Sequence, residues 1–312
     1  MSSIVQVVLP IFGLILAGWI ARRIGVLGPA ATGELNKFVV YLALPAMLFD
    51  LLATAHWSEI WRPGFLAAFG IGAGTVYAGT VGWALWRGRH LADAALDGLN
   101  AAYPNTGYIG FPLVLAALGK GALVTALLAT IVVGCGLFAL AIVLVEVGLQ
   151  VETDPRKMAG KVGLTLVRNP LLLSPALGAL YACTGAGLAV PVETFLKLLG
   201  GSASPCALVA LGLFLAEKQA STAAPQRAAT TALVTLKLFA QPALTWVVAA
   251  LVLRLEPVLV HCAVLLAALP TGTGAFMLAE FYHREAVLTA RVMLITTMAS
   301  VVTISAYLAM VR

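Results

Sequence analysis

Apolar runs of about twenty residues follow one another along almost the whole chain, and they constrain its fold more than any other feature. A run of this length crosses the roughly 30 Å hydrocarbon core of a bilayer as an α-helix. Of the 312 residues, 61% are hydrophobic and 10% are charged, whereas a soluble domain carries about 25% charged residues. The short alternating segments of a membrane β-barrel are absent from the sequence. The sequence therefore predicts an all-α membrane protein.

Ten membrane spans are predicted, and the basic residues indicate how they are oriented. The spans lie at about 4–22, 36–54, 63–86, 94–118, 121–148, 163–183, 193–216, 228–253, 258–281 and 286–311. Lys197 and Lys237 fall inside spans, and most other Lys and Arg residues lie at the odd-numbered connections. Cytoplasmic loops carry an excess of basic residues. We therefore expect the odd connections in the cytoplasm and both termini on the outer side.

The spacing of the prolines indicates that the chain is duplicated. Pro10 and Pro45 are 35 residues apart, and so are Pro170 and Pro205. The fourth and ninth spans then each contain a break, "AAYPNTGYIGFP" and "AALPTGTGAF", at roughly corresponding positions. Because each half has five spans, an odd number, the second half starts on the opposite side of the membrane and is inverted relative to the first. We predict two inverted repeats, residues 1–150 and 163–312, joined by a cytoplasmic linker at 151–162.

The two breaks predict a substrate site near the middle of the membrane. A proline opens its helix, and open backbone survives at this depth only inside protein or beside a watery cavity. The half-helix after each break points N–H groups and a positive dipole end at that cavity, which suits a carboxylate. Inverted repeats with matching interrupted spans are typical of secondary transporters, although simple kinks were the alternative. Neutral hydrogen-bonding groups stand at the breaks: Asn105, Thr106, Thr271 and Thr273.

Ionisable residues at membrane depth are further functional candidates. Lys237, in the eighth span, is expected either to neutralise a substrate carboxylate or to make a purely structural pair. Asp97, at the start of the fourth span, is a candidate for coupling to proton movement. The histidines and cysteines show no metal-ligand or redox spacing, so we expect neither a metal nor another cofactor. The sequence leaves open whether H⁺ or Na⁺ is the coupling ion.

Several classes of function are disfavoured by the sequence. The net charge of +6 belongs to loops between spans, so we expect no binding to nucleic acid. A P-loop is absent, which argues against an ATP-driven pump. We predict no catalytic residue, because neither a nucleophile with a base nor an H-E-x-x-H motif is found. An anion channel remains an alternative, although a channel does not require inverted broken helices.

Six segments resemble, along nearly the whole chain, those of the auxin efflux carrier family, which includes plant PIN proteins and bacterial permeases described as malate or malonate carriers. They are "FVVYLALPAMLF", "PNTGYIGFPL", "RNPLLLSPALG", "ALGLFLA", "KLFAQPAL" and "ALPTGTGAFMLAEFY". The resemblance implies ten helices in two inverted repeats, as in bile-acid symporters and sodium/proton antiporters. It implies that spans 3–5 and 8–10 form a transport bundle that moves like an elevator. The scaffold would comprise spans 1, 2, 6 and 7, through which PIN-like proteins form homodimers.

The resemblance also implies roles for residues at the two breaks. Pro104 and Pro270 correspond to the prolines at which the fourth and ninth helices cross. Asn105 corresponds to the asparagine that meets the substrate carboxylate. Thr106 follows it in the same motif. These residues would therefore form one wall of an anion site.

The rest of the implied site comes from the scaffold and the second break. Leu44 and Asn169, each followed by a proline, resemble residues on the scaffold side. Thr271, Gly272 and Thr273 stand where the family has a variable segment that faces the substrate. This segment is more polar than the "QGIV"-like run of plant PINs, which favours a smaller and more polar acid than an indole acid.

These observations predict a secondary carrier in a bacterial inner membrane, with both termini in the periplasm. Its expected substrates are small organic anions such as malate or malonate, moved by alternating access. A carrier of hydrophobic weak acids is the alternative within the same class.

Overall fold

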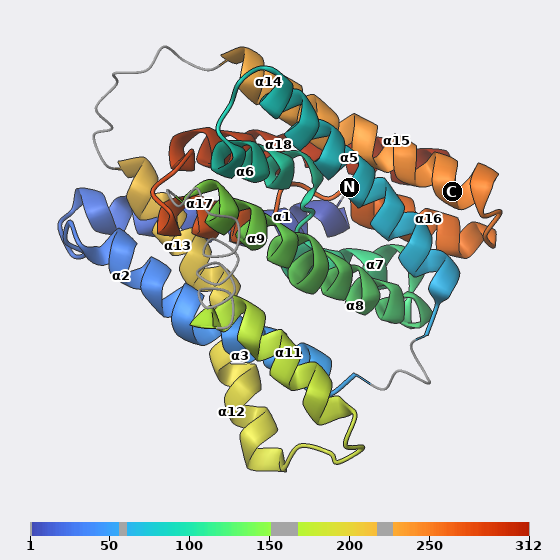
Figure 1. Cartoon of the computed structure of the whole chain (residues 1–312), viewed down its shortest axis with the longest axis horizontal. Coiled ribbons are helices and arrows are strands. Elements are labelled where there is room, and N and C mark those ends of the chain that lie inside the picture. The colour runs from blue at the N-terminus through green and yellow to red at the C-terminus, as the bar shows by residue number, and fades with distance from the viewer. Residues whose placement is uncertain (1, 56–60, 151–167, 217–226, 312) are drawn as a thin grey trace.

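The computed structural model describes residues 2–55, 61–150, 168–216 and 227–311, and these residues fold almost entirely into helices (Figure 1). Within these ranges no strand forms, apart from one isolated bridge between Pro104 and Thr271. Six helical stretches are long and apolar enough to cross a membrane: Ala31–Ala53, Pro63–Trp86, Lys120–Gly148, Val190–Ala216, Arg227–Val252 and Ala286–Val311. The predicted all-α membrane class is confirmed, whereas the ten crossings and the inverted repeat stay predictions.

The helices follow the predicted spans closely. The first, third and tenth spans are single helices, α1 (Ser2–Arg23), α5 (Pro63–Trp86) and α18 (Ala286–Val311). The sixth contains α11 (Pro170–Ala182), while its predicted residues 163–167 and the predicted linker 151–162 lie outside the described residues. The fourth is broken into α6 (Leu91–Ala102), the π-turn η2 (Thr106–Gly110) and α7 (Phe111–Leu118). The seventh and ninth are α12 (Val190–Gly201) with α13 (Ala203–Ala216), and α16 (Pro257–Ala267) with α17 (Thr273–Phe281).

The remaining spans contain wider π-helical turns. The second consists of α2 (Ala31–Phe38), η1 (Val39–Ala43) and α3 (Leu44–Ala53). The fifth consists of η3 (Lys120–Ala122), α8 (Leu123–Ile131), η4 (Val132–Leu137) and α9 (Phe138–Gly148). The eighth consists of α14 (Arg227–Thr235), η5 (Leu236–Ala240), α15 (Gln241–Trp246) and η6 (Val247–Val252).

Prolines account for three of these π-turns. η1, η2 and η5 each end two residues before a proline, namely Pro45, Pro112 and Pro242. A proline ring clashes with the carbonyl four residues earlier and offers that carbonyl no N–H. A turn widened by one residue relieves the clash, and such bulges often lie at functional sites.

The helices of the first, second, sixth and seventh spans pack on one another at very short distances. α1 lies along α13, and α3 lies against α11 and α12 (Figure 1). A Cβ atom added to Gly212 would lie 2.0 Å from the Ile15 carbonyl oxygen, and one added to Gly178 would lie 2.6 Å from the Phe49 oxygen. Small residues let membrane helices approach this closely. That these helices act as a scaffold stays a prediction.

The broken spans lie in the middle of the other helices. α6 packs against α5 and α9, and α16 packs against α5 and α15. Residues 94–102 of α6 and 262–267 of α16 are all buried. Each of these half-helices ends at the centre of the protein, where its last carbonyls need partners.

Candidate functional site

The two breaks cross each other and are joined by reciprocal backbone hydrogen bonds. The Asn105 N–H donates to the Pro270 carbonyl at 2.9 Å, and the Gly272 N–H donates to the Tyr103 carbonyl at 2.9 Å. Pro104 faces Thr271 in the antiparallel bridge. Proline therefore opens both half-helices at the same place, and the freed groups satisfy one another across the crossing.

Glycines in the second break make room for the first. A Cβ atom added to Gly272 would lie 2.7 Å from Tyr103 Cε1, and one added to Gly274 would lie 2.8 Å from the Tyr103 hydroxyl oxygen. Thr271, the residue before Gly272, is fully buried. Its hydroxyl donates to the Asn100 carbonyl at 2.8 Å. This part of the second break therefore fixes the crossing.

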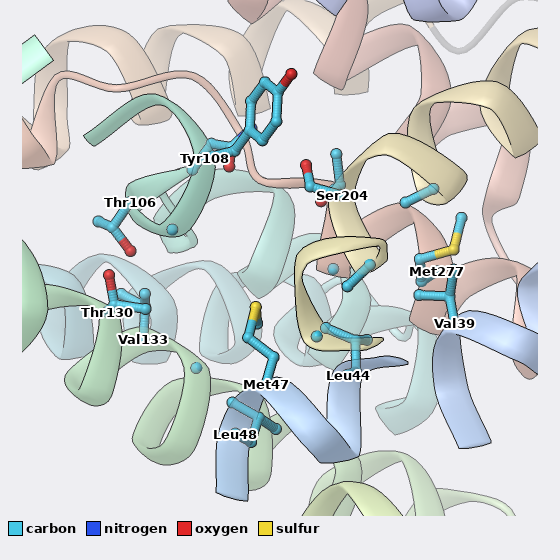
Figure 2. Close-up of a pocket in the computed structure, with 18 of the residues that line it drawn as sticks. Val39, Leu44, Met47, Leu48, Thr106, Tyr108, Thr130, Val133, Ser204 and Met277 are labelled. Atoms are coloured by element: carbon cyan, nitrogen blue, oxygen red, sulfur yellow. The ribbon is translucent and has the colours of Figure 1, made fainter. Parts of the chain in front are cut away.

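A cavity of about 140 Å³ lies beside the crossing. Figure 2 shows Leu44, Met47 and Leu48 on one side of it and Thr106 and Tyr108 on another. The residues with hydroxyl or amide side chains that line it are Tyr103, Asn105, Thr106, Tyr108, Thr130, Ser204 and Thr273. The cavity thus lies between the crossed breaks and the α3 and α13 helices.

The electrostatics of the cavity come from neutral groups. None of the described residues that line it is acidic, basic or a histidine. Two helical segments begin at its wall, η2 at Thr106 and α17 at Thr273. The first N–H groups of a helix have no partner within that helix and carry a partial positive charge. The Thr106 N–H already donates to the Pro104 carbonyl at 2.8 Å. The next N–H groups of η2 and those at the start of α17, with Asn105 beside them in the cavity lining, form a site suited to a carboxylate.

Five of the nine substrate-binding residues predicted from the sequence line the cavity: Leu44, Pro104, Asn105, Thr106 and Thr273. Pro270, Thr271 and Gly272 instead hold the crossing together through the contacts described above. Asn169 does not line the cavity; its side-chain oxygen accepts from the Leu171 N–H at 2.9 Å and caps the start of α11. These four residues make structural contacts, and their predicted contact with a substrate stays a prediction.

Ser204 is a cavity residue that sequence reasoning missed as part of the site. Its hydroxyl is buried and has no hydrogen-bond partner within the described part of the chain. A ligand oxygen would satisfy it. The signal was present in the sequence, because the 35-residue proline spacing aligns Pro205 with Pro45. In the predicted repeat Ser204 would correspond to Leu44, whereas the family resemblance pointed to Asn169 as the second scaffold residue.

Lys237 is fully buried and does not line the cavity. Its ammonium donates to the carbonyl of Ala267, the last residue of α16, at 2.8 Å. It also donates to the Gln241 side-chain oxygen at 2.7 Å. The Gln241 amide in turn donates to the carbonyl of Ala102, the last residue of α6, at 3.0 Å. Lys237 thus supports the end of α16 directly and the end of α6 through Gln241, which favours the structural alternative for Lys237.

Asp97 lies in α6, one to two turns before the break, and also lies outside the cavity lining. One carboxylate oxygen is 3.2 Å from the Arg89 guanidinium, which binds Glu285 at 2.9 Å as well. The other Asp97 oxygen is buried and has no hydrogen-bond partner among the described residues. Nearby, Arg284 donates to both oxygens of Asp93. These pairs tie the start of α6 to the connection between α17 and α18.

Comparisons with known proteins show the family to which the chain belongs. The chain matches the family described as "Membrane transport protein" over residues 3–308. It is 32% identical over 317 residues to a Rhizobium meliloti protein named "Putative malonate transporter", covering 100% of this chain and 97% of that protein. It is 27% identical over 212 residues, 67% of each chain, to an "Uncharacterized transporter" of Methanothermobacter thermautotrophicus.

Proposed function

We propose that the protein is a secondary carrier of small organic anions. The chain belongs to the membrane transport protein family and is therefore a multi-pass membrane transporter rather than an enzyme. The observation that carries this proposal is the cavity at the crossed breaks. Two helix beginnings and the Asn105 carboxamide converge there without any charged side chain in the described lining. Dipoles and neutral donors hold an anion without the permanent countercharge that would slow its release.

The size of the cavity favours a small acid. A cavity of about 150 Å³ holds one benzene molecule, and the cavity here measures about 140 Å³. Malonate and malate are comparable with benzene in size, whereas an indole acid is much larger. The name of the Rhizobium meliloti relative points to malonate. We therefore propose malonate or malate as substrate, ahead of auxin-like hydrophobic acids.

The position of the cavity is compatible with alternating access. Its walls come both from the crossed breaks and from α3 and α13, which pack with α11, α12 and α1. Sliding of the crossed breaks past α3 and α13 would carry a bound anion toward one membrane face and then the other. We propose this elevator movement as the mechanism, in keeping with inverted-repeat transporters.

Uptake of labelled malonate into proteoliposomes tests the proposed function. We expect saturable uptake, counterflow when the vesicles are preloaded with unlabelled malonate, and competition by malate but little by indole-3-acetate. Saturation and counterflow are properties of a carrier, because a channel does not couple the fluxes of its ions in this way. Flux that rises linearly with concentration would identify a channel, and failure to transport any organic acid would refute the proposal.

We further propose that the proton is the coupling ion and that Asp97 carries it. Asp97 is a buried carboxylate, and one of its oxygens forms an ion pair with Arg89. Its other oxygen has no hydrogen-bond partner among the described residues. The charges of Glu285 and Asp93 lie nearby. An imposed proton gradient is expected to accelerate malonate uptake by the wild type. Asp97→Asn should abolish this acceleration and leave counterflow intact, because counterflow needs no net proton movement.

Asp93→Asn is the matched control for Asp97, since Asp93 lies one turn earlier in α6 and is already held by Arg284. It should keep the response to the proton gradient. Acceleration by a sodium gradient alone, or an undiminished proton response in Asp97→Asn, would rule out Asp97 as the coupling site.

A further inference from the structure

A groove on the outside of the helices runs between α5 and the α14–η5–α15 span. It consists of two adjoining cavities, of about 570 and 370 Å³. The two share Thr80, Trp83, Ala232 and Leu236 as lining residues, so they form one continuous depression. The larger cavity is lined by uncharged residues only, as far as the described chain goes, and the smaller one is also lined by Arg87, Arg89 and Asp97. The groove is therefore apolar along most of its length and charged at one end.

The groove runs from hydrocarbon depth to the level of lipid headgroups. Its apolar part follows two stretches of membrane-spanning length, Pro63–Trp86 and Arg227–Val252. Its charged end coincides with the last residues of α5, where Trp86 is 81% exposed and the Arg87 guanidinium lies 4.8 Å from the ring centre of Trp83. Exposed tryptophans with adjacent basic residues mark the membrane interface.

Small residues explain why the groove exists. Gly79 of α5 and Ala232 of α14 line the groove. Larger side chains at these two positions would fill the space between the helices. The exposed Gly79 meets no atom within 4 Å of an added Cβ. In a bilayer such a gap fills with the surrounding solvent, which is an acyl chain, because empty space forfeits dispersion contacts. The apolar part thus has the length and chemistry for a lipid tail.

The charged end adds specificity for an anionic headgroup. Arg89 is engaged through one nitrogen with Asp97 and Glu285, but its Nε is buried and has no hydrogen-bond partner within the described residues. Arg87 lines the same cavity and is exposed. A phosphate oxygen is the acceptor that suits both guanidinium groups. Arg89 is shared between the Asp97 and Glu285 carboxylates, so the charge of an added phosphate would be balanced mainly by Arg87.

We propose that this groove binds one anionic phospholipid, with an acyl chain between α5 and α14 and the headgroup phosphate at Arg87 and Arg89. The site is separate from the substrate cavity, with which it shares no lining residue. A lipid bound in the groove would lie beside the connection between α5 and α6 and beside Asp97, which lines the smaller cavity.

Native mass spectrometry of the full chain in detergent tests this proposal, with phosphatidylglycerol, phosphatidylcholine or inorganic phosphate added. The wild type is expected to retain one phosphatidylglycerol in clear preference to phosphatidylcholine. Arg87→Gln should weaken phosphatidylglycerol binding about fivefold, the usual effect of one basic residue near an anionic lipid. Gly79→Leu should weaken binding of both lipids, because it fills the apolar part of the groove.

Arg62→Gln is the matched control, since Arg62 precedes the other end of the same helix beside the exposed Trp61. It should bind phosphatidylglycerol like the wild type. Ala232→Leu repeats the blocking test from the opposite wall if Gly79→Leu does not fold. Equal retention of both lipids by the wild type, unchanged binding in Arg87→Gln, or full competition by inorganic phosphate would overturn the proposal.

Discussion

Replacing Asn105 by alanine is expected to lower kcat/KM for malonate by roughly 10- to 100-fold while the protein remains folded. A hydrogen bond to a charged group contributes about 1.5–3 kcal/mol, and the change removes the carboxamide that faces the cavity. The backbone bonds of residue 105, to the Pro270 carbonyl and from the Ile109 N–H, do not depend on its side chain. Alanine can also adopt the backbone angles of residue 105, a φ of −78° and a ψ of 63°.

Two measurements on Asn105→Ala separate loss of the site from loss of the fold. Initial uptake rates in proteoliposomes give kcat/KM, and the rise in Tm on adding malonate reports binding directly. Both should fall, whereas Tm without ligand should change little. If uptake and the malonate-induced rise in Tm both matched those of the wild type, Asn105 would not contact the substrate.

Asn169→Ala is the matched control, because Asn169 is also an asparagine next to a proline but caps α11 instead of lining the cavity. Loss of a helix cap costs about 1 kcal/mol of stability. We therefore expect a lower Tm without ligand and an unchanged KM. The two asparagines should thus show opposite patterns.

Replacing Lys237 by methionine is expected to have the largest effect on stability. The change leaves the Ala267 carbonyl and the Gln241 side chain without their donor in a fully buried place. Each unsatisfied buried group costs about 1–3 kcal/mol, so the expected loss is roughly 2–5 kcal/mol. The end of α16 loses its donor, and Gln241, which holds the Ala102 carbonyl, loses the group that positions it. The Tm should therefore fall by roughly 5–15 °C.

Lys197→Met provides the comparison for Lys237→Met, since Lys197 forms only an exposed ion pair with Glu193. Exposed pairs contribute little to stability, so its Tm should stay near that of the wild type. A variant Lys237→Met with unchanged Tm but weakened malonate binding would show instead that the ammonium neutralises the substrate. Thermal unfolding with and without malonate distinguishes the two roles.

The fold was largely predictable from local features of the sequence. Span lengths follow from the apolar runs, and Pro104 and Pro270 mark the two breaks two and three residues after the observed helix ends at Ala102 and Ala267. The π-turns were not predicted, although each of three precedes a proline. Their positions depend on how one freed carbonyl is accommodated, which the apolar pattern does not specify.

The candidate site was predictable only in part. Asn105, Thr106 and Thr273 line the cavity as expected, because each lies at the start of a half-helix that points into it. Thr271 looks equivalent to Thr273 in the sequence, yet its hydroxyl is bound to the Asn100 carbonyl. Ser204 was overlooked and Asn169 was favoured, although only Ser204 lines the cavity.

The sequence by itself determined the membrane class, the positions of the helices and the two breaks. In hydrocarbon each backbone group must find its partner within its own helix, so this information is local. Tertiary structure alone decided which polar side chains are free for a ligand and which are already satisfied. Thr271 meets a carbonyl 171 residues away, and Gln241 meets one 139 residues away. Such partners come together only when the two breaks cross, and that crossing separates the residues that hold the protein together from those that face the anion.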